Sequence, residues 1–309
     1  MAELGFYEVR GLRLAWHAWG RPDAPVAMLL HGFLDHGLSY AVTAERLADS
    51  YRILAPDVRG HGHSGWVGAG GYYHFHDYYH DLHTLIGALG LTRFHLVGHS
   101  MGGMIATGLA ALFADRVQSV VLLDGMGPPA TPPERGLERL RTWTHALDAR
   151  GFGGDEATRR AARRPMDGVA DAAARLQFAN ERLSGEHALR LATSGTEPFG
   201  AAGQVVWRHD PLHRTPGPRP FRTEDGMPLW RAMTMPTLSI YTELGEWTPK
   251  DLAERHAALP RATCALVHGA GHNVHHEKPE WLADVLRAWW QAPGDVLPQG
   301  LQPGEPQRA

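Results

Sequence analysis

The sequence predicts an α/β fold in which a mostly parallel sheet is flanked by helices. Short apolar runs, bounded by Gly, Pro and Asp, alternate along most of the chain with segments of helical spacing. These runs are apolar throughout rather than at every second position, as in strands that are covered on both faces. The alternation stops over residues 127–232, which predicts an insertion of a different kind.

The expected strands and helices follow from these runs in chain order. Residues 5–18 are expected to form an antiparallel pair, and the later runs to form parallel strands. The strand-like runs are 12–18, 26–30, 51–55, 94–97, 120–123, 237–241 and 265–267. Helical spacing between them predicts helices over 39–47, 78–89, 103–113 and 280–290.

The same pattern divides the chain into parts. Residues 1–126 and 233–292 are expected to form one core domain. The insertion at 127–232 is rich in Ala and Arg, is interrupted by prolines and has helical runs, so we expect a helical cap over the carboxyl ends of the strands. The tail at 293–309 repeats Pro and Gly without periodicity and is expected to be disordered.

Composition narrows the partners of the protein. Of 309 residues, 43% are hydrophobic and 20% are charged, with a formal net charge of −3. This balance predicts no nucleic-acid partner and no attraction to an anionic membrane. No apolar run resembles a signal peptide or reaches membrane-spanning length, so no membrane insertion is expected. The single cysteine, Cys264, excludes an intrachain disulfide and favours a reducing compartment, so a cytoplasmic protein is expected. The sequence leaves the oligomeric state open.

The candidate nucleophile is Ser100, the centre of a G-x-S-x-G pentapeptide at 98–102. A strand-like run precedes the pentapeptide and a helix-like run follows it. This context is typical of a nucleophile elbow, in which a strained turn lifts the serine hydroxyl above the sheet. Gly98 and Gly102 are expected where the strand and the helix approach too closely for a side chain.

The serine needs a base and two donors for an oxyanion. His272 lies in the glycine-rich stretch after the last strand, at a carboxyl end where active sites of open sheets gather, and is the candidate base. The candidate donors are the backbone N–H groups of Met101, the residue after the serine, and of Phe33, in the loop after the strand at 26–30.

The acid that orients the base is less defined by the pattern. Chain order in this architecture runs serine, acid, histidine. Asp124 ends the strand at 120–123, whereas Glu243 and Glu246 follow the strand at 237–241. All three residues therefore remain candidates at this point.

The chain resembles the α/β-hydrolase superfamily over nearly its whole length, apart from the insertion and the tail. The resemblance rests on His-Gly-Phe at 31–33, Asp-Val-Arg-Gly-His-Gly-His-Ser at 57–64, the pentapeptide and Gly-His at 271–272. It implies an eight-stranded, mostly parallel sheet with a cap after the sixth strand. The spacing is most similar to the branch with a serine nucleophile and to serine hydrolase-like proteins.

The resemblance also decides among the acids. Most members carry an aspartate in a Gly-x-x-Asp turn after the seventh strand, where this chain has Thr242 and Gly245. Some relatives, notably haloalkane dehalogenases, carry the acid after the sixth strand, the position of Asp124. We therefore predict Asp124 as the acid, with Glu243 second and Glu246 third.

These residues predict a serine hydrolase that cleaves carboxylic esters through an acyl-enzyme. Thioesterase, lactonase and carbon–carbon bond hydrolase remain alternatives with the same triad, and a non-catalytic ligand receptor on the hydrolase fold is the alternative from another class. Ser100 argues against haloalkane dehalogenases and epoxide hydrolases, which use an aspartate there. The substrate is expected to be a small-molecule ester with an apolar acyl group, and no cofactor or metal is implied.

Two further groups of residues have ordinary interpretations. His76, His80 and His83 share one face of a helix, and we expect a solvated face rather than a metal site. Aromatic residues of the insertion are expected to divide between an acyl pocket and its own core. They are Trp143, Phe178, Phe199, Trp207, Phe221 and Trp230.

Overall fold

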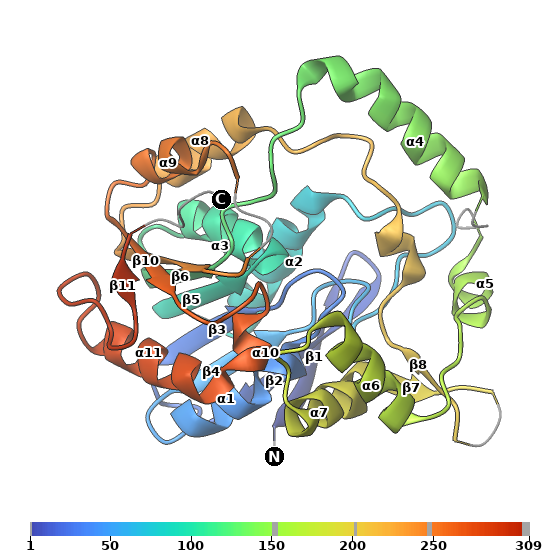
Figure 1. Cartoon of the computed structure of the whole chain (residues 1–309), viewed down its shortest axis with the longest axis horizontal. Helices are drawn as coiled ribbons and strands as arrows, with labels where there is room; N and C mark the ends of the chain where they lie inside the picture. The colour runs from blue at the N-terminus through green and yellow to red at the C-terminus, as the bar shows by residue number, and fades with distance from the viewer. Residues whose placement is uncertain (1, 150–153, 201–202, 246–248, 305–309) are drawn as a thin grey trace.

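The computed structural model describes residues 2–149, 154–200, 203–245 and 249–304. Within these ranges the main element is a nine-stranded sheet with the order β1-β2-β4-β3-β5-β6-β9-β10-β11 (Figure 1). Its strands are β1 (Glu3–Val9), β2 (Leu12–Trp19), β3 (Val26–Leu30), β4 (Arg52–Pro56), β5 (Phe94–His99), β6 (Val117–Leu123), β9 (Thr237–Thr242), β10 (Ala262–Val267) and β11 (Gln302–Pro303).

The strand directions confirm the predicted mostly parallel sheet. β1 pairs antiparallel with β2, and β2 pairs antiparallel with β4. From β4 through β3, β5, β6 and β9 to β10, each neighbouring pair is parallel. The carboxyl ends of these strands therefore meet along one edge of the sheet, which is where polar loop residues gather.

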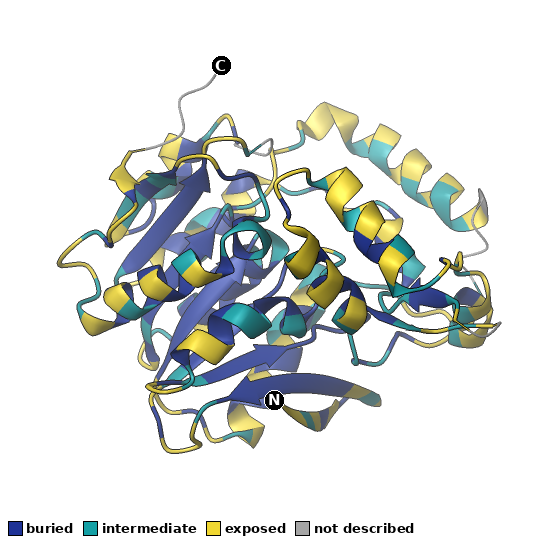
Figure 2. Ribbon diagram, turned by 60° about the horizontal axis from the view of Figure 1, so that its bottom comes forward, coloured by how far each residue is buried: buried dark blue, intermediate teal, exposed yellow. Residues whose placement is uncertain are grey.

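Helices cover both faces of the sheet (Figures 1 and 2). One face carries α2 (Phe75–Ala88), α3 (Met101–Leu112), α8 (Thr223–Arg231) and α9 (Leu252–Ala257). The other face carries α1 (Ala41–Leu47), α10 (Val274–Glu277) and α11 (Pro279–Gln291), next to the short 3-10 helix η1 (Gly37–Tyr40). The predicted core helices are all present, with ends that differ by a few residues.

The two covered faces explain why the central strands are apolar throughout. In β6, Val120 and Leu122 point into the core on the α3 side, whereas Val121 and Leu123 point into the core on the α11 side. All four side chains are almost fully buried. Successive side chains of a strand alternate between faces, so both sets of side chains in this stretch are apolar.

Residues 127–232, between β6 and β9, form mostly helices. The elements there are the 3-10 helix η2 (Pro133–Arg135), α4 (Gly136–Ala149), α5 (Glu156–Ala161), α6 (Val169–Ala179), α7 (Gly185–Gly195), the 3-10 helix η3 (Pro211–Arg214) and α8. A small antiparallel pair, β7 (Thr196–Pro198) with β8 (Val205–Trp207), was not predicted.

The insertion has a small core of its own. Ala172 of α6, Ala188 and Leu191 of α7 and Val205 of β8 are buried together. Helix α8 is different, because its buried Trp230 lies in the core between α3 and the sheet. The end of the insertion is therefore packed on the main domain.

The tail differs from the expected disorder in its first part. Within 293–304, β11 pairs antiparallel with β10, and Leu301 packs into the core on the α11 side. Backbone hydrogen bonds to the sheet edge and the buried Leu301 order this stretch. Composition rich in Pro and Gly does not predict either contact. Residues 305–309 lie outside the described ranges. None of the helices in the described ranges has the length and apolar character needed to span a bilayer.

Candidate active site

Ser100 lies at the sharp turn between β5 and α3. Its backbone has φ 51° and ψ −115°, a positive φ that is rare for a residue with a side chain. The turn is held by the Ser100 N–H, which donates to the Leu123 carbonyl at 3.0 Å, and by the Ser100 carbonyl, which accepts from Gly103 at 3.0 Å. The strained conformation expected of a nucleophile elbow is present at this residue.

Two glycines allow the close approach of strand and helix. A Cβ atom on Gly98 would overlap the backbone of Gly102 and Gly103. A Cβ atom on Gly102 would overlap the carbonyl groups of Leu30 and His31 at the end of β3. Each clash involves backbone, which cannot move aside without deforming the sheet, so both positions require glycine.

His272 and Asp124 meet beside this turn. Asp124 directly follows β6, and His272 lies in the loop between β10 and α10. His272 Nδ1 is 3.2 Å from Asp124 Oδ2, and the two side chains are 21% and 10% exposed. Within the described ranges the Ser100 hydroxyl has no hydrogen-bond partner, which is common for catalytic serines without bound substrate.

Thr242 orients the Asp124 carboxylate. Its hydroxyl donates to Asp124 Oδ2 at 2.6 Å, and its backbone N–H donates to Asp124 Oδ1 at 3.2 Å. Asp124 itself has φ 43°, and its N–H donates to the Ile240 carbonyl at 2.9 Å. The carboxylate is thus fixed from β9 while it faces His272. Sequence reasoning noted Thr242 only as a departure from the usual turn.

Glu243, the second candidate acid, is not brought to His272. Glu243 is exposed and accepts from the Gly269 N–H at 2.9 Å, with His268 Nδ1 3.2 Å away. The hydrogen bond from the Gly269 N–H lowers the pKa of Glu243 most, and the contact with His268 lowers it further. Glu246 lies outside the described residues.

The loop with the candidate donor Phe33 is held by two histidines. His31 Nε2 accepts from the Val58 N–H at 3.1 Å, and His61 Nε2 accepts from the Leu34 N–H at 3.2 Å. Among the described residues, the N–H groups of Phe33 and Met101 donate to no other group. Two backbone donors beside Ser100 are therefore available to a bound group.

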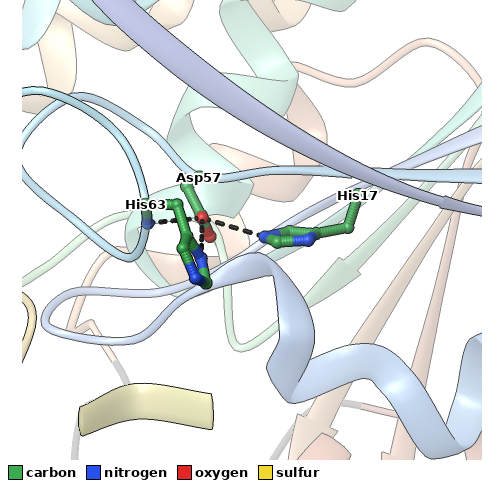
Figure 3. Close-up of side chains that lie close together, drawn as sticks. All are labelled: His17, Asp57 and His63. Atoms are coloured by element: carbon green, nitrogen blue, oxygen red, sulfur yellow. Dashed lines mark hydrogen bonds and ion pairs between the residues drawn. The ribbon is translucent and has the colours of Figure 1, made fainter. Parts of the chain in front are cut away.

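The loop at 57–64 is anchored by a buried carboxylate (Figure 3). Asp57 accepts from His17 Nε2 at 2.9 Å, from the Gly37 N–H at 2.6 Å and from the His63 N–H at 2.8 Å. Burial alone would raise the pKa of Asp57, but the hydrogen bonds from His17 and His63 hold it well below its usual value. Through the Val58 N–H, which donates to His31, the loop at 57–64 supports the loop that carries Phe33.

A second carboxylate joins the insertion to the His272 loop. Glu277 of α10, with only 2% of its side chain exposed, accepts from the Gly271 N–H at 2.8 Å. It also accepts from Arg182 Nε at 3.1 Å and from Asn180 Nδ2 at 2.9 Å, both in the segment after α6. Sequence reasoning missed this contact, because nothing local links residues separated by about 95 positions.

The remaining sequence predictions concern the histidines of α2 and the aromatic residues of the insertion. His76, His80 and His83 are exposed on α2, as expected of a solvated face. Of the aromatic residues in the insertion, Trp230 is buried in the main core and Phe178 is 90% exposed. Among the described residues, a cavity of about 350 Å³ and another of about 550 Å³ are lined by neither Ser100 nor His272.

Part of the chain is similar in sequence to known hydrolases. Residues 25–141 match the family model described as the alpha/beta hydrolase fold. A 3-hydroxybutyrate-oligomer hydrolase of Cupriavidus necator is 37% identical over 129 residues, 41% of this chain and 43% of that protein. A serine hydrolase-like protein of Danio rerio is 36% identical over 120 residues, 39% of this chain and 35% of that protein. The chain thus spans less than half the length of these relatives.

A solved structure matches nearly the whole chain. The thioesterase domain from the curacin biosynthetic pathway superimposes with a TM-score of 0.80 at 27% identity, over 93% of this chain and 99% of that domain. The match therefore extends well beyond the share of the chain that the sequence relatives cover. The chain has the α/β-hydrolase fold.

Proposed function

We propose that the protein is a serine hydrolase that cleaves carboxylic esters through an acyl-enzyme. The observation that carries the proposal is the 3.2 Å contact between His272 Nδ1 and Asp124 Oδ2, at the same sheet edge as the strained turn of Ser100. A nucleophile, a base and an acid on the ends of different strands are the parts that acyl transfer requires.

In the first half of the reaction, Ser100 Oγ attacks the acyl carbon and His272 Nε2 accepts the hydroxyl proton. The tetrahedral intermediate collapses, the ester C–O bond breaks, and His272 returns the proton to the leaving alkoxide. The products are an alcohol and an acyl group on Ser100. In the second half, His272 takes a proton from water, the resulting hydroxide attacks the acyl carbon, and the carboxylic acid leaves as Ser100 regains its proton.

Asp124 keeps His272 in the form that this cycle needs. Its Oδ2 faces Nδ1, so the Nδ1 proton stays on that side and Nε2 is free to accept a proton from Ser100. The charge of the carboxylate also stabilises the imidazolium that forms after proton transfer. Thr242 is a positioning residue for Asp124, because it fixes both carboxylate oxygens.

The backbone N–H groups of Phe33 and Met101 are proposed to bind the oxyanion. The Met101 N–H is at the N-terminus of α3, where the helix dipole favours negative charge. Loss of one such donor typically lowers the rate by about 10²–10³-fold. The hydrogen bonds that His31 and His61 accept from the Val58 and Leu34 N–H groups preorganise the loop, so that these donors need not move during the reaction.

Residues 127–232 are proposed to act as a cap over this site. Their position between β6 and β9, and the contacts of Asn180 and Arg182 with Glu277 beside the His272 loop, support that role. Substrate is proposed to be a small-molecule ester with an apolar acyl group. The relative that acts on 3-hydroxybutyrate oligomers, whose units are joined by ester bonds, supports this bond type.

A thioesterase is the second candidate, because the thioesterase domain from the curacin pathway shares the whole fold. A panel of p-nitrophenyl esters from acetate to dodecanoate, run beside thioesters with the same acyl groups, tests both. The proposal predicts ester turnover that rises with acyl length to an optimum and disappears in Ser100→Ala. Turnover of thioesters alone would assign the second candidate, and no turnover of either class would contradict both.

A further inference from the structure

Near the turn of Ser100, the carboxylate of Asp35 contacts two histidines and lies close to a third. Asp35, in the loop between β3 and η1, accepts from Ser39 Oγ at 2.9 Å. Its Oδ2 is also 3.0 Å from His275 Nε2 and 3.2 Å from His276 Nε2, both on α10. Burial would raise the pKa of Asp35, but the charge of His276 and the hydrogen bonds of both histidines hold it well below its usual value. The carboxylate is therefore an ionised oxygen donor.

His99, the residue before the candidate nucleophile, completes the cluster. Its ring centroid is 4.2 Å from that of His275. Asp35, His99 and His275 each have a potential ligand atom, and these three atoms lie within 4.8 Å of one another. His99 is 3% exposed and His275 is fully buried, so the arrangement is built into the core and is not a chance surface group.

Each of these two imidazoles has a buried nitrogen without a partner. His99 Nε2 donates to the His272 carbonyl at 2.8 Å, and His275 Nε2 faces Asp35. The opposite nitrogen, Nδ1 in both rings, has no hydrogen-bond partner among the described residues. For His275 to bind an ion together with Asp35, the ligand atom must be Nε2, which faces the carboxylate, and Nδ1 must carry the proton. Burial, followed by the neighbouring histidines, lowers the pKa of His275 to about 3 and that of His99 well below its usual value. Both rings are neutral at physiological pH, the form in which imidazole binds metal ions.

A second group of histidines and an aspartate among the described residues differs in its carboxylate. Asp57 lies between His17 and His63 (Figure 3), yet it already accepts backbone N–H groups from Gly37 and His63. An ion there would have to displace both backbone hydrogen bonds and the turn that they hold. Asp35 has no such backbone donor among the described residues, so its oxygens are less committed.

The Asp35 cluster also borders a cavity. This cavity, of about 350 Å³, lies between η1, α1 and α7. Ser39, His275 and His276, the three residues that hold Asp35, are part of its lining. Asp35 and His99 are not in this lining, so the cavity borders the cluster at His275.

We propose that Asp35, His99 and His275 form a binding site for a divalent transition-metal ion of the zinc class. Two neutral imidazoles and one carboxylate are ligands that zinc prefers, and a water molecule from the cavity would supply the fourth. Tetrahedral ligands of zinc lie about 3.4 Å apart, so binding shortens separations of up to 4.8 Å between the ligand atoms by up to about 1.4 Å.

Such a site is coupled to the candidate active site through one hydrogen bond. His99 holds the carbonyl of His272, so an ion that pulls the His99 ring also pulls the loop of the base. This consequence rests on the proposed function and predicts that the ion inhibits ester hydrolysis. The binding site itself does not depend on it.

Binding is tested with Co²⁺, whose visible absorption reports coordination, on metal-stripped protein. The wild-type protein is expected to bind one equivalent, and Asp35→Asn and His275→Gln to bind at least about tenfold more weakly. His63→Gln, in the other group, and His76→Gln, on the surface of α2, are matched controls that should bind as the wild type does. Circular dichroism melting of each variant checks that it is folded.

Three results overturn the site: no absorption from the wild type at one equivalent, absorption retained in both Asp35→Asn and His275→Gln, or absorption lost only in His272→Gln, which would move the ion to the triad. The coupling is tested by ester turnover, which Zn²⁺ should lower and chelator restore in the wild type but not affect in Asp35→Asn. Binding without inhibition overturns the coupling alone. Binding by a protein with no ester turnover would contradict the proposed function and leave the ion site standing.

Discussion

A Cβ atom on Gly245 would lie 3.0 Å from Asp124 Oδ2. The carboxylate of Asp124 thus occupies the space into which a side chain at position 245 would project, although the two residues follow different strands. Position 245 is where most members of the superfamily carry their aspartate. A carboxylate at position 124 and one at position 245 would therefore occupy the same space beside His272. Only one of the two positions can carry a carboxylate there without crowding.

The first prediction separates the candidate acids. Asp124→Asn keeps the shape of the side chain but removes its charge and allows the wrong tautomer of His272, so we expect kcat to fall by about 10⁴-fold. Glu243→Gln should change kcat less than about twofold, because Glu243 binds Gly269 and His268. Steady-state kinetics with a p-nitrophenyl ester measures both. A large loss in Glu243→Gln with a small one in Asp124→Asn would assign the role to the later loop.

The second prediction uses the shared space directly. The double variant Asp124→Gly/Gly245→Asp moves the carboxylate to the other strand, and glycine suits the positive φ of position 124. We expect about ten- to a hundredfold more activity than in Asp124→Gly alone, a coupling typical of residues in contact. Gly245→Asp alone should lower activity, because two carboxylates then compete for one place. Activity of the double variant equal to that of Asp124→Gly would show that the positions are not interchangeable.

The third prediction concerns Glu277 as a positioning residue. Glu277→Gln weakens its contacts with the Gly271 N–H and with Arg182, so His272 is held less firmly. We expect kcat to fall by about ten- to a hundredfold, the size of effect that a small misplacement produces, with KM little changed. Asp171→Asn, which breaks the exposed pair with Arg175 on α6, is the matched control and should have no effect. A Glu277→Gln variant with unchanged kcat would limit the contact to a structural role.

The fourth prediction is the pH dependence of stability. Burial is the largest cause that lowers the pKa of His95 to about 4 and of His213 and His275 to about 3. Their unfolded-state pKa is about 6.5, so below that pH the unfolded chain binds protons that the folded protein refuses. Stability should therefore be greatest above pH 6.5 and fall steadily toward the folded values.

Denaturant unfolding between pH 7.5 and 5 measures this slope. His95→Gln removes one such group, so its stability should fall less steeply, by up to about 1.4 kcal/mol per pH unit. Stability that rises on acidification, or a slope that the substitution leaves unchanged, would contradict the account of these buried histidines.

Local sequence patterns predicted the elements that are formed by residues close together in the chain. The strand β5, the turn and the helix α3 follow from an apolar run, a glycine pair and a second apolar run in one continuous segment. The parallel sheet follows from strands that are apolar at every position. For the acid, the local pattern left Asp124, Glu243 and Glu246 open, and only the resemblance to the α/β-hydrolase superfamily favoured Asp124.

Contacts between distant segments could not be predicted in this way. Thr242 binds Asp124 across 118 positions, and His275 binds Asp35 across 240. Nothing in the local sequence distinguishes Glu277 from any other acid in an exposed helix, yet its side chain is almost fully buried. Such partners are chosen by the packing of whole elements, which a reading of one segment at a time does not contain.

The central claim, that Ser100 is an activated nucleophile, is tested most directly by a fluorophosphonate probe on folded protein, followed by mass spectrometry of its peptides. We expect one adduct on Ser100. It should be absent in Ser100→Ala and form much more slowly in His272→Ala, because the base must remove the hydroxyl proton. A folded wild-type protein that is not labelled, or a label that persists in Ser100→Ala, would contradict it.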